Sequence, residues 1–156
     1  MWCGAVGCIV SLVLSLLAAP LAATAQPGGK VWRIGVLTVL APESPRWAPF
    51  HQGLRELGYV EGQNIAFEWR LSGGRPERFP ALAAELVRLQ VDVIVAGDNP
   101  AIAAAQQATS TIPIVMVLAM DPVRTGFVGS LAQPGGNITG LTVQGTDIQG
   151  KALQLL

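Results

Sequence analysis

The stretch VDVIVAGDNPAIAAAQQATSTIPIVMVL, residues 91–118, decides the fold. A β-branched run at 91–96 is followed by the turn residues GDNP at 97–100, an alanine-rich segment at 101–108 and a second apolar run at 113–118. Short apolar runs bounded by turn residues are typical of buried strands, and the alanines favour a helix that packs close to a sheet. The order strand, helix, strand predicts two parallel strands joined by a crossover helix.

The same alternation extends in both directions along the chain. Residues 32–40 (WRIGVLTVL) and 138–143 (ITGLTV) predict further buried strands, whereas the period-2 pattern of residues 64–70 (NIAFEWR) predicts an edge strand. Apolar residues at helical spacing and proline starts predict the remaining helices at 47–57, from 76 to about 89, and from 121 to about 131. We therefore expect an α/β fold, a doubly wound parallel five-stranded sheet in the order 2-1-3-4-5.

Such sheets bind ligands beyond the carboxyl ends of their strands, near the point where the strand order reverses. Glu43, Ser44 and Trp47 follow the first predicted strand and are the first candidate ligand-binding residues. Trp47 either stacks on an aromatic solute or starts the packed face of the first helix.

Three polar candidates follow the third and fourth strands. Asp98 either receives a solute ammonium or faces water, and Asn99 before Pro100 either caps the following helix or binds solute. Asp121 is interpreted in the same two ways, as a helix cap or as a ligand-binding residue. Free backbone N–H groups at helix starts would favour a solute carboxylate here.

Composition excludes several classes of protein. The 156 residues carry 10 Lys and Arg against 10 Asp and Glu, a formal net charge of zero, with 51% hydrophobic residues. A neutral chain with so few charges lacks the basic surface of a nucleic-acid-binding protein, and it is too apolar to be disordered. We expect no nucleic-acid partner.

The amino terminus predicts export. An apolar run at residues 9–17 precedes Pro20 and the small residues Ala23 and Ala25, which fit a signal peptidase site between Ala25 and Gln26. The only cysteines, at positions 3 and 8, fall within this segment, so the mature chain would contain none. A chain without free thiols suits an oxidising compartment such as the periplasm.

Sequence motifs for catalysis and cofactor binding are absent. The chain lacks a G-x-G-x-x-G turn, a phosphate-binding P-loop and a G-x-S-x-G nucleophile turn, and it shows no metal-ligand spacing. Its single histidine, His51, falls within the first predicted helix, where it is read as a surface or packing residue. We therefore expect no catalytic residue, metal or cofactor, and no enzymatic activity.

Several longer stretches carry a family resemblance. These are GYVEGQN at 58–64, TIPIV at 111–115 and PGGNITG at 134–140. Together with the predicted signal peptide, they make the chain from about residue 33 onward resemble bacterial ABC-transporter substrate-binding proteins of the uncharacterised or tryptophan-type group, which have the type I periplasmic binding fold.

The resemblance implies a two-lobed protein about twice this length, which closes on a small solute and delivers it to membrane permease and ATPase subunits. The domains expected from it are a signal peptide at 1–25, an amino-terminal lobe at 26–145 and the start of a crossover helix at 146–156. The solute implied is small, and for some members of the family it is an aromatic amino acid. The alternatives left open are a secreted doubly wound enzyme, a sensor lobe, or a non-functional truncated gene product.

Overall fold

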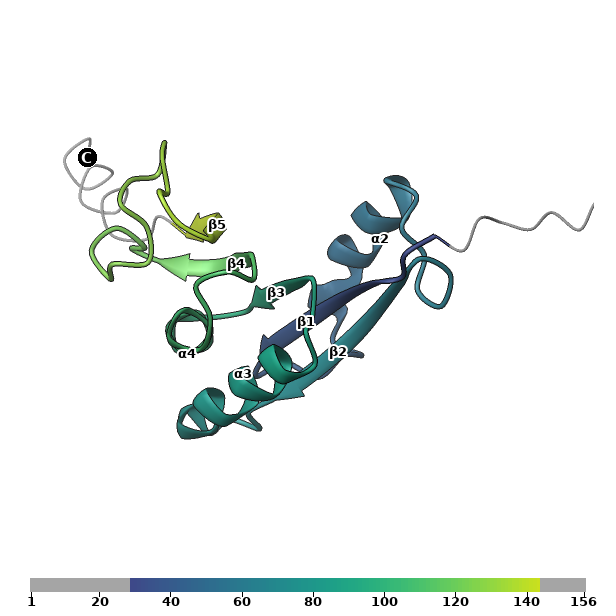
Figure 1. The fold of residues 1–156 in the computed structure, drawn as a ribbon, viewed down its shortest axis with the longest axis horizontal. Helices are drawn as coiled ribbons and strands as arrows, with labels where there is room; N and C mark the ends of the chain where they lie inside the picture. Colours follow the sequence, from purple (N-terminus) through teal and green to yellow (C-terminus); the bar gives the residue numbers. More distant parts are fainter. Residues whose placement is uncertain (1–28, 144–156) are drawn as a thin grey trace, which may run out of the picture.

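The computed structural model describes residues 29–143, which form a single five-stranded sheet (Figure 1). The strands are β1 (Trp32–Thr38), β2 (Ile65–Leu71), β3 (Val93–Ala96), β4 (Ile114–Met120) and β5 (Ile138–Val143). They lie in the order β2-β1-β3-β4-β5, and every neighbouring pair is parallel. The predicted fold class and strand order are confirmed.

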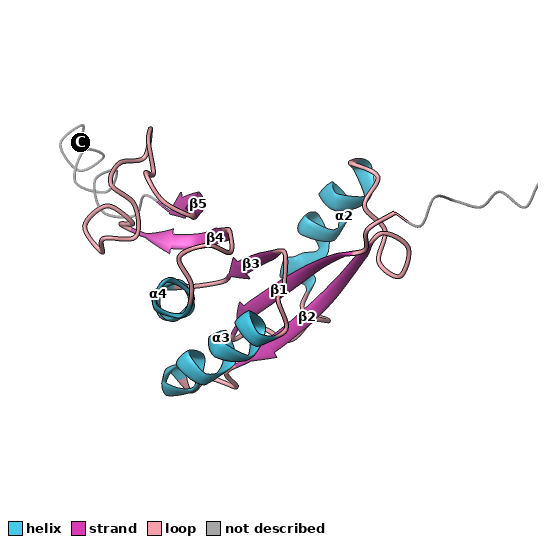
Figure 2. Ribbon diagram, in the orientation of Figure 1, coloured by secondary structure: helices cyan, strands magenta, loops and turns pink. Residues whose placement is uncertain are grey.

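Three helices connect the strands (Figure 2). They are α2 (Ala48–Glu56), α3 (Phe79–Arg88) and α4 (Asn99–Ala108), and the first two are preceded by 3₁₀ turns, η1 (Pro45–Trp47) and η2 (Pro76–Arg78). Each 3₁₀ turn begins at a proline, whose fixed φ suits the first turn of a helix and which has no N–H to leave unpaired. The helices expected at 47–57, 76–89 and 101–108 are therefore present.

The helix expected from 121 to about 131 is wrong, because this segment is a series of turns. Asp121 and Gly126 have positive φ angles of 48° and 75°, which a right-handed helix does not allow. Phe127 and Val128 are nevertheless buried against the sheet. The two buried side chains thus cover the sheet as the predicted helix would have done.

The helices divide between the two faces of the sheet. One hydrophobic cluster joins Leu37, Leu86 and Ile102, so α3 and α4 cover the same face. A second cluster joins Val36 and Trp47 on the opposite face, where α2 lies. The split follows from right-handed crossovers, since the chain moves from β1 to β2 in one direction and from β2 through β3 to β4 in the other.

Some predicted segments lie outside the described residues. They are the signal peptide at 1–25, the ends of the predicted lobe at 26–28 and 144–145, and the crossover helix at 146–156. Within residues 29–143, no helix is long and apolar enough to cross a membrane.

Gly140 allows β5 to lie close to β4. Its φ is +138°, and a Cβ atom there would lie 2.2 Å from the carbonyl oxygen of Met116. We expect Gly140→Ala to lower the free energy of unfolding by roughly 2–4 kcal/mol, because two backbones would have to separate. Chemical denaturation measures the loss. Gly136→Ala is the control, since its Cβ would meet no atom within 4 Å, and an equal effect of both substitutions would contradict the prediction.

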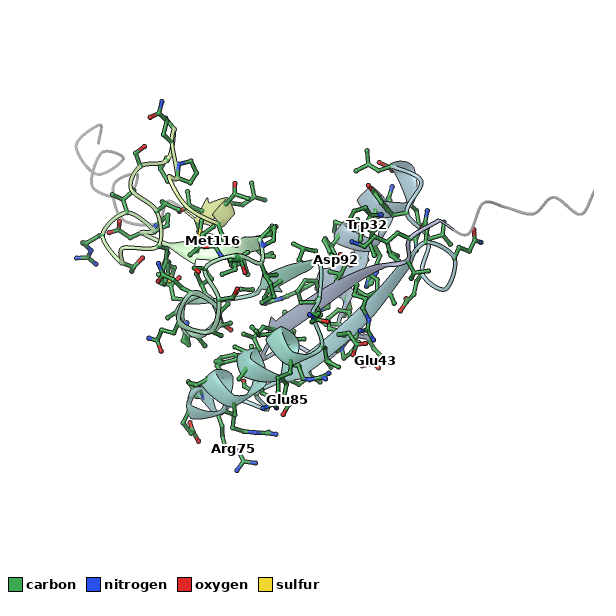
Figure 3. The ribbon with its side chains drawn as sticks, viewed as in Figure 1. Trp32, Glu43, Arg75, Glu85, Asp92 and Met116 are labelled. Carbon is green, nitrogen blue, oxygen red and sulfur yellow. The ribbon has the colours of Figure 1, made fainter. Side chains whose placement is uncertain are left out.

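Asp92 holds the amino end of β1, close to Trp32 (Figure 3). Its carboxylate accepts a 2.8 Å hydrogen bond from the Arg33 backbone N–H and another from the Lys30 ammonium. These two bonds outweigh the opposing effect of burial and lower the pKa of Asp92. A carboxyl whose pKa is lowered by folding stabilises the folded chain at neutral pH, and this contribution is lost as the pH falls.

We therefore expect Asp92→Asn to reduce the unfolding midpoint at pH 7, with a difference from the parent chain that shrinks below about pH 4. Denaturant titrations at a series of pH values measure this difference. Glu77→Gln changes an exposed carboxyl and is the control. A difference between Asp92→Asn and the parent chain that stays constant or grows toward low pH would contradict the assignment.

Candidate functional site

The pairing of β1 and β3 continues beyond the carboxyl end of β3. The Gly97 N–H donates a 3.0 Å hydrogen bond to the Leu37 carbonyl, which continues the strand pairing past the end of β3. A Cβ atom at Gly97 would lie 2.8 Å from the Thr38 hydroxyl oxygen. That hydroxyl in turn accepts a 3.1 Å bond from the Leu40 N–H. The absence of a side chain at 97 therefore sets the spacing of the strand ends.

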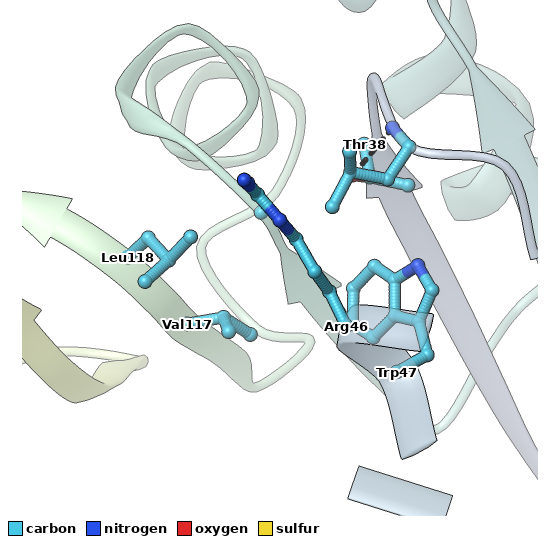
Figure 4. Close-up of a pocket in the computed structure, with 7 residues that line it drawn as sticks. Thr38, Arg46, Trp47, Val117 and Leu118 are labelled. Carbon is cyan, nitrogen blue, oxygen red and sulfur yellow. Dashed lines mark hydrogen bonds between the residues drawn. The ribbon is translucent and has the colours of Figure 1, made fainter. Parts of the chain in front are cut away.

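A pocket of about 330 Å³ opens above this contact (Figure 4). Its volume is at the lower end of the range for small-molecule sites. Its lining comes from the ends of β1, β3 and β4 and from η1. The lining residues are Thr38, Leu40, Arg46, Trp47, Gly97, Val117 and Leu118. The pocket thus occupies the edge of the sheet at which parallel α/β folds bind ligands.

Trp47 both packs in the core and lines the pocket. Its side chain is 4% exposed and makes edge-to-face contacts with Phe50 and Trp69, at ring-centre distances of 5.9 and 5.3 Å. Its indole N–H has no hydrogen-bond partner among the described residues, and neither does the buried Ser72 hydroxyl. Buried polar groups without a partner are uncommon in folded proteins. Trp47 therefore combines a packing role with a place at the site.

Glu43 and Ser44 lie in the turn before η1, but neither lines the pocket. Glu43 is exposed to solvent. The Ser44 N–H donates to the Ala41 carbonyl over 3.0 Å, and the Ser44 carbonyl accepts from the Trp47 N–H over 3.0 Å. The backbone of Ser44 thus shapes the turn that places Trp47.

Asp98 caps α4, so of the two alternatives for Asn99, helix cap or solute binding, the helix cap is wrong. The Asp98 carboxylate accepts a 3.0 Å bond from the Ala101 N–H, and its extended backbone is the conformation that an N-cap requires. Asn99 is the first helical residue. Its side-chain amide donates to the Met120 carbonyl over 2.9 Å and accepts from the Met120 N–H over 2.8 Å. Asn99 therefore fastens α4 to the end of β4.

Asp121 begins a turn, so of its two alternatives, helix cap or ligand-binding residue, the helix cap is also wrong. Its carboxylate forms a 2.8 Å ion pair with Arg124 and accepts a 3.3 Å bond from the Arg124 N–H. Asp98, Asn99 and Asp121 all lie near strand ends, but none of them lines the pocket. Their polar groups are instead engaged with neighbouring residues of the chain.

Sequence reasoning missed most of the pocket lining. Arg46 and Gly97 lie in the segments that follow the first and third strands. The ligand-binding residues predicted in these segments were other residues, namely Glu43, Ser44, Trp47, Asp98 and Asn99. Val117 and Leu118 are strand residues, and their pattern alone does not distinguish them from core positions. A cation within the turn-rich segment that follows the first predicted strand was the available signal for Arg46.

Two further sequence predictions concern metal binding and the single histidine, His51. Residues 29–143 contain no group of three or more His, Cys, Asp or Glu side chains able to hold a metal ion. His51 is half-buried and lies edge-on to Phe67, with ring centres 5.1 Å apart. His51 was interpreted as a surface or packing residue of the first helix, and the contact with Phe67 agrees with the packing alternative.

One curated protein and several solved structures are similar to this chain. A curated tyrosine-binding protein of Clostridioides difficile strain R20291 is 36% identical over 91 residues, which are 58% of this chain and 26% of that protein. The chain thus spans about a quarter of the length of this curated relative.

Three solved structures share the fold. A ligand-free, open substrate-binding protein with adhesive properties from Clostridium difficile has 27% identity and a TM-score of 0.71, over 80% of this chain and 43% of that one. An ABC domain in complex with L-Trp from Streptococcus pneumoniae has 29% identity and a TM-score of 0.62, over 71% and 38%. A conserved domain protein of Vibrio cholerae has 33% identity and a TM-score of 0.69, over 80% and 43%.

A family model agrees with these relatives. The model for ABC transporter substrate binding proteins matches residues 45–152, which are more than half of the chain. This match begins at η1 and includes every strand after β1. The chain belongs to the ABC transporter substrate binding protein family.

Proposed function

We propose that this chain is the amino-terminal lobe of the solute-binding component of an ABC importer. In this proposal the pocket at the carboxyl ends of β1, β3 and β4 holds one side of a small solute of the amino-acid class. The observation that carries the proposal is the position of the pocket, because it lies at the ligand-binding edge of a parallel sheet and is lined mainly by apolar side chains.

Two relatives support the class of solute. One is named for binding tyrosine, and the other was solved with L-Trp. A lining of Leu40, Trp47, Val117 and Leu118 suits the apolar or aromatic body of such a solute. Trp47 is the only one of the six sequence candidates for which we propose direct contact. Asp98 and Asn99 act by holding α4 and β4 in place, Ser44 and Asp121 shape the surrounding turns, and Glu43 is exposed in the turn before η1.

The wider role follows the family. The matched solved chains are more than twice as long as the part that this chain covers, so we propose that a second lobe supplies the other half of the contacts and closes over the solute. The protein would then deliver its solute to membrane permease and ATPase subunits, with no catalytic step of its own. The predicted signal peptide supports a periplasmic or otherwise exported location.

Aromatic amino acids should bind in this pocket, and weakly, because one lobe leaves half of the solute in water. We expect L-tyrosine and L-tryptophan to bind the chain from Gln26 to Leu156 with dissociation constants on the order of millimolar. The backbone NMR signals of Thr38 and Gly97 and the indole signal of Trp47 should shift during the titration.

A matched pair of variants locates the binding. Leu118→Glu places a charge at the pocket wall and should abolish the shifts, whereas Leu57→Glu alters a side chain that is 76% exposed at the end of α2 and should leave them unchanged. Shifts confined to Tyr59, Ile65 and Val93, at the opposite end of the sheet, would contradict the proposed site.

Export is tested separately. We expect the chain, expressed with its own amino terminus in a Gram-negative host, to be recovered from the periplasm with Gln26 as its first residue. Ala23→Arg should prevent this cleavage, because signal peptidase requires small residues there. Intact mass measurement distinguishes the two forms, and a parent chain that keeps its first 25 residues would contradict the prediction.

A further inference from the structure

Arg46 is the one charged residue among the residues that line the pocket in the described part of the chain. It lies in the middle of η1, directly before Trp47, and it is exposed. Figure 4 shows its side chain extending from η1 into the space between Thr38 and Leu118. A guanidinium at the mouth of an apolar pocket can bind a carboxylate through two parallel hydrogen bonds.

No residue in the described part of the chain pairs with this guanidinium. Within residues 29–143, Arg46 has no ion pair and no side-chain hydrogen bond, whereas Arg70 and Arg124 are both paired with carboxylates. The charge of Arg46 therefore remains available to a ligand in the pocket.

A second positive feature near the strand ends, the amino end of α4, is already neutralised. The amino end of α4 was expected to attract a solute carboxylate, but the Asp98 carboxylate occupies it by accepting the bond from Ala101. The Gly97 N–H is likewise taken by the Leu37 carbonyl. Recognition of an anion in this pocket therefore falls to Arg46.

The lining of the pocket also contains no carboxylate to pair with an ammonium group. Asp98 is committed to its helix cap and Asp121 to Arg124, and neither lines the pocket. Glu43 is exposed in the turn outside it. In the described part of the chain, the pocket is thus lined by one cation, Arg46, and by no anion.

We propose that Arg46 determines the specificity of this lobe by binding the carboxylate of the solute, while Trp47, Val117 and Leu118 hold its apolar body. This inference rests on the proposed function and adds the class of ligand. The lobe selects an apolar carboxylate and does not distinguish an amino acid from the same acid without its ammonium group.

Three probes with the same phenyl body test this assignment: L-phenylalanine, 3-phenylpropionate, which lacks the ammonium, and phenethylamine, which lacks the carboxylate. NMR titration of the chain from Gln26 to Leu156 should give affinities within about threefold for the two carboxylates. Phenethylamine should bind at least about tenfold more weakly, because it cannot pair with Arg46.

Arg46→Gln should weaken both carboxylates by about tenfold and leave phenethylamine at its low affinity. Arg46→Lys keeps the charge without the planar fork and should fall between the two. Arg55→Gln is the matched control, because it removes an exposed arginine from the last turn of α2 that does not line this pocket. It should leave all three affinities unchanged.

The two proposals fail in different ways. If all three probes bind in the pocket with similar affinity, or if Arg46→Gln leaves carboxylate binding intact, the role of Arg46 is overturned and the solute site stands. If the parent chain binds none of the probes and no aromatic amino acid, both the role of Arg46 and the proposed function are overturned.

Discussion

The site depends on the close approach of β1 and β3 at their carboxyl ends. The Gly97 N–H extends the pairing to the Leu37 carbonyl, and the missing side chain at 97 leaves room for the Thr38 hydroxyl only 2.8 Å from where a Cβ would be. These two strands lie on either side of the point where the chain reverses its direction across the sheet. The contact therefore forms the floor of the pocket, and η1 and β4 supply its walls.

The polar residues beside this floor make hydrogen bonds and an ion pair within the chain. Asp98 caps α4, Asn99 ties that helix to the backbone of Met120, and Asp121 pairs with Arg124. Because their hydrogen-bonding groups are satisfied within the chain, the pocket keeps an apolar wall with a single free cation in the described part of the chain. Capping of α4 by a carboxylate is thus linked to the role we propose for Arg46, since the cap removes a competing anion site.

The sequence predicted the architecture well, because buried parallel strands and amphipathic helices leave strong periodic patterns. The strands, their order and three of the helices follow from such patterns. The segment after β4 did not, since Asp121 and Gly126 adopt positive φ angles while Phe127 and Val128 still supply the apolar residues expected of a helix. The sheet edge that carries the pocket was also predictable, but most of the residues that line the pocket were not. Asp98 does not line the pocket because it caps α4, and Arg46 lines it because of the path of η1. Neither the cap nor this path can be inferred from the spacing of residues in the sequence.

The central claim is that the solute lies against the carboxyl ends of β1, β3 and β4. Intermolecular nuclear Overhauser effects between an aromatic amino acid and methyl groups of the chain test it most directly. The account predicts effects from the solute ring to the methyl groups of Val117 and Leu118, which line the pocket. Effects to Ile65 and Val93 instead, at the amino ends of the strands, would place the solute at the opposite edge of the sheet and contradict the account.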